Sequence, residues 1–163
     1  MMQEFKAQKK DCILLLVGDG ERFDFIKNTA AEMGVEDSVV FCGRRSDVCE
    51  MMQIADCVVL PSEYEGLPTV AVEAQAAGVP ILLSDKITRQ CDMGFGLAEF
   101  LPIKDAGDWV RAVEETINRF RATSQDVQEN MRRIELKGFT ADASGKYYCV
   151  SLRKIIERTR DRT

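Results

Sequence analysis

Short apolar runs alternate with amphipathic segments through most of the chain, and this alternation constrains the fold more than any other feature. The apolar runs have strand length, and glycine or proline closes them, for example Gly18 after the first run and Pro61 after the third. Segments between the runs repeat apolar residues at helical spacing. Such alternation produces parallel strands joined by right-handed crossovers. The sequence therefore predicts an α/β fold, with a Rossmann-like parallel sheet flanked by helices.

The expected strands and helices follow from these runs and from the glycine and proline residues that end them. Strands are expected at residues 12–17, 39–42, 57–60, 80–83 and 98–101. Helices are expected at residues 2–10, 23–33, 48–54, 69–77, 106–121, 125–136 and 143–160. We expect Ser46 to cap the third helix, and residues 12–17 to form a strand buried on both faces. Folds of this kind usually begin with a strand, so we expect at least one strand–helix unit upstream of residue 1.

Composition removes several kinds of chemistry. The chain has 163 residues, 45% apolar and 30% charged, which suits one globular domain. Its net charge of −5 argues against attraction of the whole surface to nucleic acid. The sequence has no histidine, which excludes catalytic triads and histidine-ligated zinc, and no Asp-x-Asp motif. We expect no metal and no cofactor, and acid–base steps must use carboxylates, lysine, tyrosine or the substrate.

The cysteines and the hydropathy pattern bear on the compartment. No two of the six cysteines have Cys-x-x-Cys spacing, and Cys12, Cys42 and Cys57 lie in apolar runs, where a thiol behaves as a small hydrophobic group. We therefore expect reduced thiols throughout. No apolar run approaches the roughly 20 residues that span a bilayer, and the N-terminus lacks the apolar core of a signal peptide. A cytoplasmic protein is expected.

The richest candidate loop, residues 61–68, follows the third predicted strand. Ligands of open parallel sheets bind beyond the carboxyl ends of the strands. This loop leads into a helix whose first amides are unpaired and suit a diphosphate. Glu65 would lie at the helix mouth and Glu73 deeper, so that one nucleotide-sugar could offer hydroxyl groups to both carboxylates. The alternative is structural, with glutamates that balance the helix dipole and contact only solvent.

Residues 61–80 also resemble a known family signature. The pair Glu65 and Glu73 is similar to the Glu-x7-Glu motif of family 4 retaining glycosyltransferases, which have the GT-B fold. The strings at 17–20, 40–44 and 54–62 resemble that family in the same order, and those at 84–88 and 108–109 resemble its exopolysaccharide and capsule-building members. The resemblance spans residues 10–120, about the C-terminal, donor-binding domain of such enzymes.

The resemblance implies a role for each matching residue. Glu65, the expected catalytic residue, would hold hydroxyl groups of the transferred sugar, and Glu73 would bind the ribose. The other expected donor-binding residues contribute phosphate-binding amides (Gly66, Leu67, Thr69), a cation beside the base (Arg44) and an open floor (Gly18, Gly20). Two alternatives stay open: the glycines only shape turns, and Arg44 with Arg45 forms a solvated basic rim.

The implied function is transfer of a sugar from a nucleotide-sugar, with UDP-sugars favoured, to a glycan or lipid-linked acceptor in surface-polysaccharide synthesis. The reaction would be retaining and metal-independent, and the leaving diphosphate would help to take the acceptor proton. Residues 1–163 would be the donor-binding domain. The acceptor would bind an N-terminal domain outside this sequence, so these residues alone should be inactive. The implied partners include no nucleic acid, and peripheral membrane association of the full-length enzyme is compatible with them.

Other functions stay open. A nucleotide-sugar epimerase with the GT-B fold would use the same diphosphate site, and a non-catalytic module would bind nucleotide without transfer. A flavodoxin-like receiver would need an acceptor aspartate after the third strand, where the chain has Pro61 and Ser62. Related capsule enzymes usually have a glutamate where this chain has Gln90. The basic helix expected at 143–160 could dock a partner domain or approach anionic lipid, or it is a solvated tail.

Overall fold

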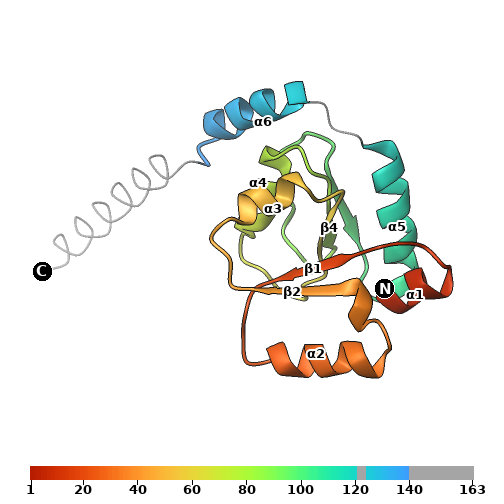
Figure 1. Ribbon diagram of the computed structural model, residues 1–163. Coiled ribbons are helices and arrows are strands. Elements are labelled where there is room, and N and C mark those ends of the chain that lie inside the picture. The colour runs from red at the N-terminus through yellow and green to blue at the C-terminus, as the bar shows by residue number, and fades with distance from the viewer. Residues whose placement is uncertain (121–123, 140–163) are drawn as a thin grey trace, which may run out of the picture. The chain divides into compact units, whose positions relative to one another are not determined.

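The computed structural model describes residues 1–120 and 124–139, in two compact units, Met1–Ala122 and Thr123–Thr163 (Figure 1). The strands of the first unit are β1 (Leu14–Val17), β2 (Val39–Gly43), β3 (Val58–Leu60), β4 (Ile81–Ser84) and β5 (Ala98–Leu101). Its helices are α1 (Met2–Ala7), α2 (Phe23–Glu32), α3 (Val48–Gln53), α4 (Thr69–Ala76) and α5 (Ala106–Arg119), with 3-10 turns η1 (Glu36–Ser38) and η2 (Arg89–Cys91). The second unit contains α6 (Ser124–Leu136).

The strands are all parallel but form two sheets. β1 pairs with β2, while β3, β4 and β5 pair in that order. The expected α/β class with parallel strands flanked by helices is confirmed. One continuous sheet is not formed, because no ladder of hydrogen bonds joins β1 to β3 in the described part of the chain. In Figure 1 β1 and β2 run together across the molecule, and β4 runs in another direction.

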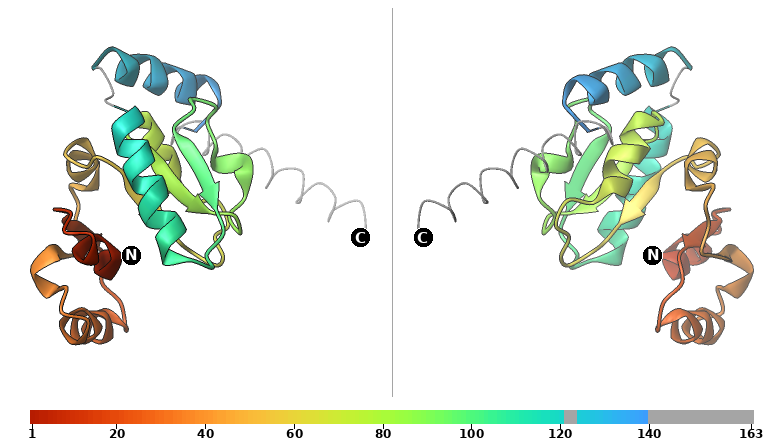
Figure 2. Two further views of the ribbon diagram at one scale, coloured as in Figure 1. Left: turned by 90° about the vertical axis from the view of Figure 1, so that its right-hand side faces the viewer. Right: turned by 90° about the vertical axis from the view of Figure 1, so that its left-hand side faces the viewer.

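The core is built on both faces of β4. Ile81, Leu82 and Leu83 are all completely buried. Alternate side chains of a strand point to opposite faces, so Leu82 joins a cluster with Trp109 and other residues of α5, whereas Ile81 and Leu83 join a cluster with α4. Figure 2 shows the corresponding arrangement, with α5 and α4 on either side of the β3–β5 sheet. β4 is therefore held on both faces, and the loop at its carboxyl end starts from this buried strand.

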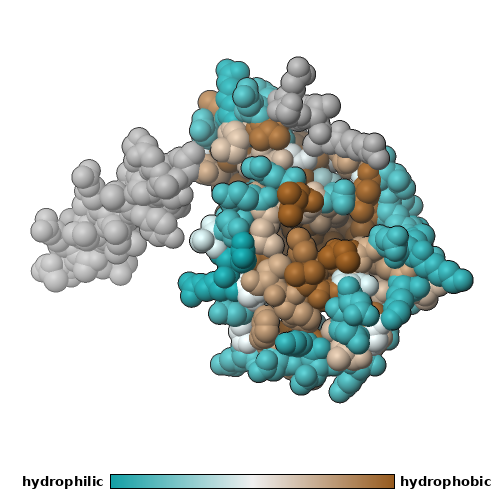
Figure 3. Space-filling view, viewed as in Figure 1, coloured by the Kyte–Doolittle hydropathy of each residue, from teal (hydrophilic) through white to brown (hydrophobic). Residues whose placement is uncertain are grey.

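β1 is less buried than its sequence predicts. The strand was expected to be covered on both faces, yet Leu14, Leu15 and Leu16 are half-buried and Val17 is 42% exposed. Ile13 and Val40, beside it in sequence and in the paired strand, are also exposed. Apolar side chains gather on this face of the surface (Figure 3). The expectation fails because Leu14 and Leu16 pack against the buried cluster around Trp109, whereas Leu15 and Val17, on the other face, join neither buried cluster.

The N-terminal end of α3 also differs from expectation. Asp47, not Ser46, is the N-cap residue, and no side chain caps the helix. The Asp47 carboxylate instead accepts hydrogen bonds from the Arg45 guanidinium, one of them 2.7 Å long from Nε to Oδ1. This ion pair occupies the carboxylate that would otherwise accept from the first amides of the helix.

Two further expectations concern thiols and membranes. Cys12, Cys42, Cys49, Cys57 and Cys91 are free thiols, and Cys149 lies outside the described residues. Burial raises the pKa of the Cys57 thiol to about 12. Within the described ranges, no helix has the length and apolar character needed to cross a bilayer. The basic helix expected at 143–160 also lies outside the described residues.

Candidate functional site

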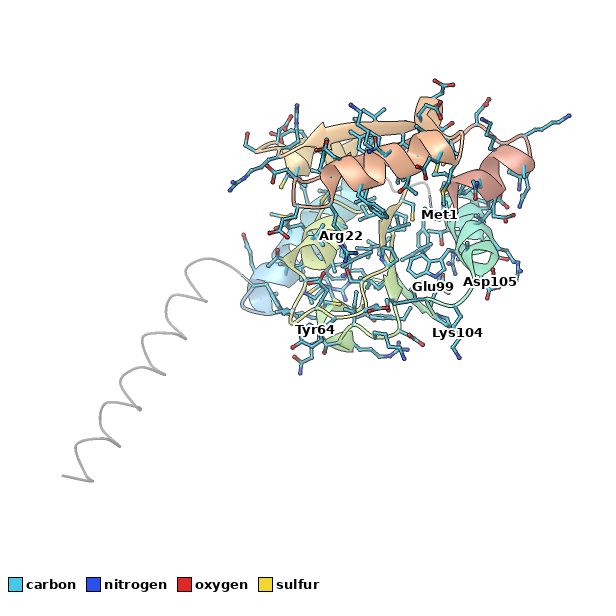
Figure 4. All side chains as sticks on the ribbon, turned by 90° about the horizontal axis from the view of Figure 1, so that it is seen from below. Met1, Arg22, Tyr64, Glu99, Lys104 and Asp105 are labelled. Atoms are coloured by element: carbon cyan, nitrogen blue, oxygen red, sulfur yellow. The ribbon has the colours of Figure 1, made fainter. Side chains whose placement is uncertain are left out.

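The candidate site is built at the edge where β3, β4 and β5 end. Because these strands are parallel, the segments that follow them share one side of the sheet. Figure 4 looks onto this side, with Tyr64 after β3 and with Lys104 and Asp105 after β5. Tyr64 is 85% exposed, so the loop from Pro61 to Pro68 reaches well into solvent. This edge presents loops to a ligand while β4 stays in the core.

The N-terminus of α4 is free of side-chain caps. Pro68 is the N-cap residue, in extended conformation with φ −70° and ψ 107°, and no side chain accepts from the first turn. The amides of Thr69 and Val70 are therefore left without a helical partner. Gly66 leaves open space, since a Cβ placed there would meet nothing within 4 Å. Uncapped amides beside an open glycine form a site that an anionic oxygen can approach closely.

Glu65 is held in place within its loop. The Ser62 hydroxyl donates a hydrogen bond of 3.0 Å to Oε1 of Glu65, and both side chains are half-buried. Glu63, in contrast, is exposed. The bond orients the Glu65 carboxylate and leaves its other oxygen for a further donor, such as a hydroxyl group.

Glu73 lies on the outer face of α4. Its neighbours Val72, Ala74 and Gln75 are buried, whereas Glu73 is exposed. Within the described residues its carboxylate takes part in no ion pair or side-chain hydrogen bond. Sequence reasoning placed Glu73 deeper along the helix than Glu65, and the structure agrees, since Glu65 precedes the helix and Glu73 lies in its second turn.

The turns after β1 and β2 form a second group of predicted residues. The amide of Gly18 donates to the carbonyl of Gly43 at 2.7 Å, which brings the two turns together. Gly18 has φ +133° and Gly43 has φ +61°, conformations that favour glycine. A Cβ at Gly18 or Gly20 would meet nothing within 4 Å, so the floor here is open. Within the described residues no hydrogen bond links this group to the Pro61–Pro68 loop.

Of the two arginines after β2, Arg44 is the one available to a ligand. The Arg45 guanidinium donates to the Asp47 carboxylate, and this hydrogen bond lowers the pKa of Asp47. Arg44 is exposed and forms no ion pair with any described residue. Among the described residues, Arg44 is thus the arginine after β2 whose guanidinium has no carboxylate partner.

Two further cations lie after strand ends and were not among the predicted site residues. Lys86 comes two residues after β4, where its amide donates to the buried Ser84 hydroxyl at 3.0 Å. Arg22 comes two residues after the Gly18–Gly20 turn and is the N-cap residue of α2 (Figure 4). Both are exposed, and neither forms an ion pair with a described residue. Their positions, in the segments that connect a strand to the next helix or turn, are the feature by which sequence reasoning could have found them.

A cavity of about 320 Å³ lies apart from these residues. Its lining includes Leu97 and Ala98, at the amino end of β5, and Thr116 and Phe120, at the end of α5. The amino end of a parallel strand is opposite the edge described above. None of the residues predicted for the site lines this cavity.

The fold and the carboxyl-edge loops define a domain of a GT-B glycosyltransferase. The chain belongs to the family described as glycosyl transferases group 1, whose model matches residues 1–130. The expected relationship to family 4 type glycosyltransferases is thereby confirmed.

Named relatives agree with this assignment. The chain is 38% identical over 116 residues to the putative glycosyltransferase EpsF of Bacillus subtilis. This alignment covers 71% of the chain and 29% of EpsF. It is 33% identical over 82 residues to a UDP-Gal:alpha-D-GlcNAc-diphosphoundecaprenol alpha-1,3-galactosyltransferase of Escherichia coli, covering 50% of the chain and 21% of that enzyme. The chain thus spans less than a third of either relative.

Solved structures share the fold. Anabaena HepE, crystallised in complex with UDP, superposes with a TM-score of 0.61 at 20% sequence identity. The alignment covers 99% of this chain and 44% of HepE.

Proposed function

We propose that this chain is the donor-binding domain of a retaining, metal-independent glycosyltransferase that uses a nucleotide-sugar, with a UDP-sugar favoured. The acceptor would be a glycan or lipid-linked saccharide in surface-polysaccharide synthesis. The observation that carries the proposal is the junction between β3 and α4, where uncapped amides at Thr69 and Val70 lie next to an open Gly66 and a restrained Glu65.

The diphosphate would bind at the start of α4. Free amides and the positive end of the helix dipole attract an anion without a metal ion. The exposed Lys86 forms no ion pair with a described residue, so it can offset the charge of the leaving group. In such a site the amides of Gly66, Leu67 and Thr69 bind the phosphate, and Arg44 lies beside the base.

The two glutamates would bind the hydroxyl groups on either side of the diphosphate. Glu65, fixed by Ser62, has one carboxylate oxygen available for the transferred sugar. Glu73, exposed on the next turn of helix, has both oxygens available for a ribose diol. The departing diphosphate is the base that we assign to the acceptor proton, an assignment that is compatible with the absence of histidine from these 163 residues.

Relatives support the choice of UDP. One relative named above is a UDP-galactose enzyme, and HepE was solved with UDP. The diphosphoundecaprenol-linked acceptor in the name of the Escherichia coli enzyme supports a lipid-linked acceptor. The particular sugar is left unassigned.

We also propose that a strand–helix unit upstream of α1 and an acceptor-binding domain complete the enzyme. In doubly wound folds of strand order 3-2-1-4-5-6, the first strand lies in the middle. The break between β1 and β3, together with the half-exposed apolar side chains of β1, is the place where such a strand would pair. Transfer of sugar by residues 1–163 alone would contradict this proposal.

Calorimetry of the whole chain with UDP and with GDP tests the nucleotide site. UDP is expected to bind more tightly than GDP, and Glu73→Ala is expected to weaken binding about tenfold, the equivalent of about 1.4 kcal/mol. Glu63→Ala is the matched control, because Glu63 is an exposed glutamate close to the same helix. Equal loss in both variants, or no binding of any nucleotide, would remove the basis of the proposal.

A further inference from the structure

The amide of Gln75 is completely buried and joins α4 to the segment between β4 and β5. Its Nε2 donates to the carbonyl of Cys91 at 2.8 Å and to the carbonyl of Ala71, one turn back in α4, also at 2.8 Å. Its Oε1 accepts from the amide of Met93 at 2.9 Å. One side chain thus satisfies backbone groups of two segments.

The segment that Gln75 holds is continuous with the loop after β4. The Thr88 hydroxyl accepts from the amide of Gln90 at 3.3 Å, and the Cys91 thiol donates to the Thr88 carbonyl at 3.1 Å. The Arg89 guanidinium lies 4.4 Å from the centre of the Phe100 ring in β5. These contacts make the run from Thr88 to Met93 one folded piece.

Only a primary amide can make this set of bonds. A side chain of the same size without polar atoms would leave the Cys91 carbonyl and the Met93 amide without these partners, and Cys91 and Met93 are both buried. A charged glutamate could accept from Met93 but could donate to neither carbonyl. The buried position therefore requires both a donor and an acceptor.

We infer that Gln75 is a positioning residue for the donor site, which it serves by fixing the β4–β5 segment against α4. The loop that carries Lys86 leads directly into this segment, which packs on α4 through the buried side chains of Ile87 and Cys91, and the Gln75 amide adds directional hydrogen bonds to that apolar contact. Gln75 lies two residues after Glu73, on the buried face of the same helix. The expected effect of Gln75 on ligand affinity rests on the proposed function. Its expected effect on the β4–β5 segment rests on the hydrogen bonds described above alone.

Hydrogen exchange and calorimetry of Gln75→Met test the inference. We expect the amides of residues 86–93 to exchange at least tenfold faster, while those of α5 keep their rates, and UDP to bind about tenfold more weakly. The exposed Gln53, changed to Met, is the matched control and should alter neither property. Unchanged exchange in residues 86–93, or faster exchange throughout the domain, would overturn the anchoring role. Faster local exchange with unchanged UDP affinity would overturn the positioning role.

Gln75→Glu gives a second readout that survives if the methionine variant does not fold. A buried carboxyl is protonated more readily, and the neutral form again has one donor and one acceptor. UDP affinity of this variant, relative to wild type, should therefore recover as the pH falls from about 8 to about 5. If the UDP affinity of Gln75→Glu stays equally reduced at every pH, the hydrogen bonds of Gln75 are not what supports binding. If wild type binds no UDP, the proposed function fails, and the exchange rates still decide whether Gln75 anchors the segment.

Discussion

The Ser62 hydroxyl donates a hydrogen bond of 3.0 Å to the Glu65 carboxylate, across the turn that leads into α4. The bond restrains the orientation of a half-buried glutamate directly before the uncapped helix. A carboxylate that is already oriented loses less conformational freedom on binding than a mobile one.

Ser62→Ala should therefore weaken binding of the sugar part of the donor. We expect affinity for a UDP-sugar to fall about tenfold or more, since a hydrogen bond to a charged group contributes about 1.5 to 3 kcal/mol. Affinity for UDP, which lacks the sugar, should change little. Calorimetry with both ligands gives the comparison, and equal losses for both would show that Ser62 acts on the nucleotide instead.

Arg44 and Arg45 should differ in their effect on nucleotide binding. Arg44→Gln removes an exposed cation without an ion pair among the described residues, and it should weaken UDP binding about fivefold, less so at high salt. Arg45→Gln breaks a surface pair with Asp47 and should change UDP affinity little. Titrations at low and high ionic strength measure both effects. A larger loss for Arg45→Gln would reverse the assignment of the two residues.

Leu82→Ala should destabilise the domain strongly. Leu82 is completely buried in the cluster with Trp109, and loss of a core leucine costs about 2 to 5 kcal/mol. Leu67→Ala, at a side chain that is 44% exposed in the Pro61–Pro68 loop, should cost less than about 0.5 kcal/mol. Urea unfolding followed by circular dichroism measures both. Similar midpoints for the two variants would place the core elsewhere.

The thiols of Cys49 and Cys57 should react at very different rates. Burial raises the pKa of Cys57 to about 12, so at pH 8 its reactive thiolate is scarce and shielded, whereas Cys49 is exposed. We expect iodoacetamide to label Cys49 first, as peptide mass spectrometry would detect. Reactivity of Cys57 in the native protein should appear only as the pH rises toward its pKa. Early labelling of Cys57 would mean that β3 opens readily.

The sequence predicts the elements well and their assembly less well. The runs ending at Val17, Leu60 and Leu83 are strands, because uninterrupted apolar residues and a following turn residue are local properties. The capping role of Ser46 is wrong because Arg45 engages Asp47, a choice between two polar partners that spacing does not decide. The break between β1 and β3 depends on which strands are present to pair, which no local pattern contains.

The candidate site was predictable to a similar degree. The position of Glu65 before a helix and of Glu73 within it follows from Pro68 and from the apolar spacing of α4. The hydrogen bonds of the buried Gln75 amide were not predictable, because they join segments 16 to 18 residues apart and depend on the folded chain. The bond from Ser62 to Glu65 is local, but it depends on the conformation of the loop, which spacing does not decide. Where the roles of Glu65 and Glu73 come from family resemblance alone, they stay predictions.

Among the described residues, no strand pairs with the second side of β1 or of β3, and this has a practical consequence for handling the polypeptide. A bare row of backbone N–H and C=O groups on an apolar strand is a template for intermolecular pairing. Preparations of residues 1–163 should accordingly form oligomers or precipitate as concentration rises, and a short β-hairpin fused ahead of Met1, or lysines in place of exposed Val17 and Val40, should keep them monodisperse.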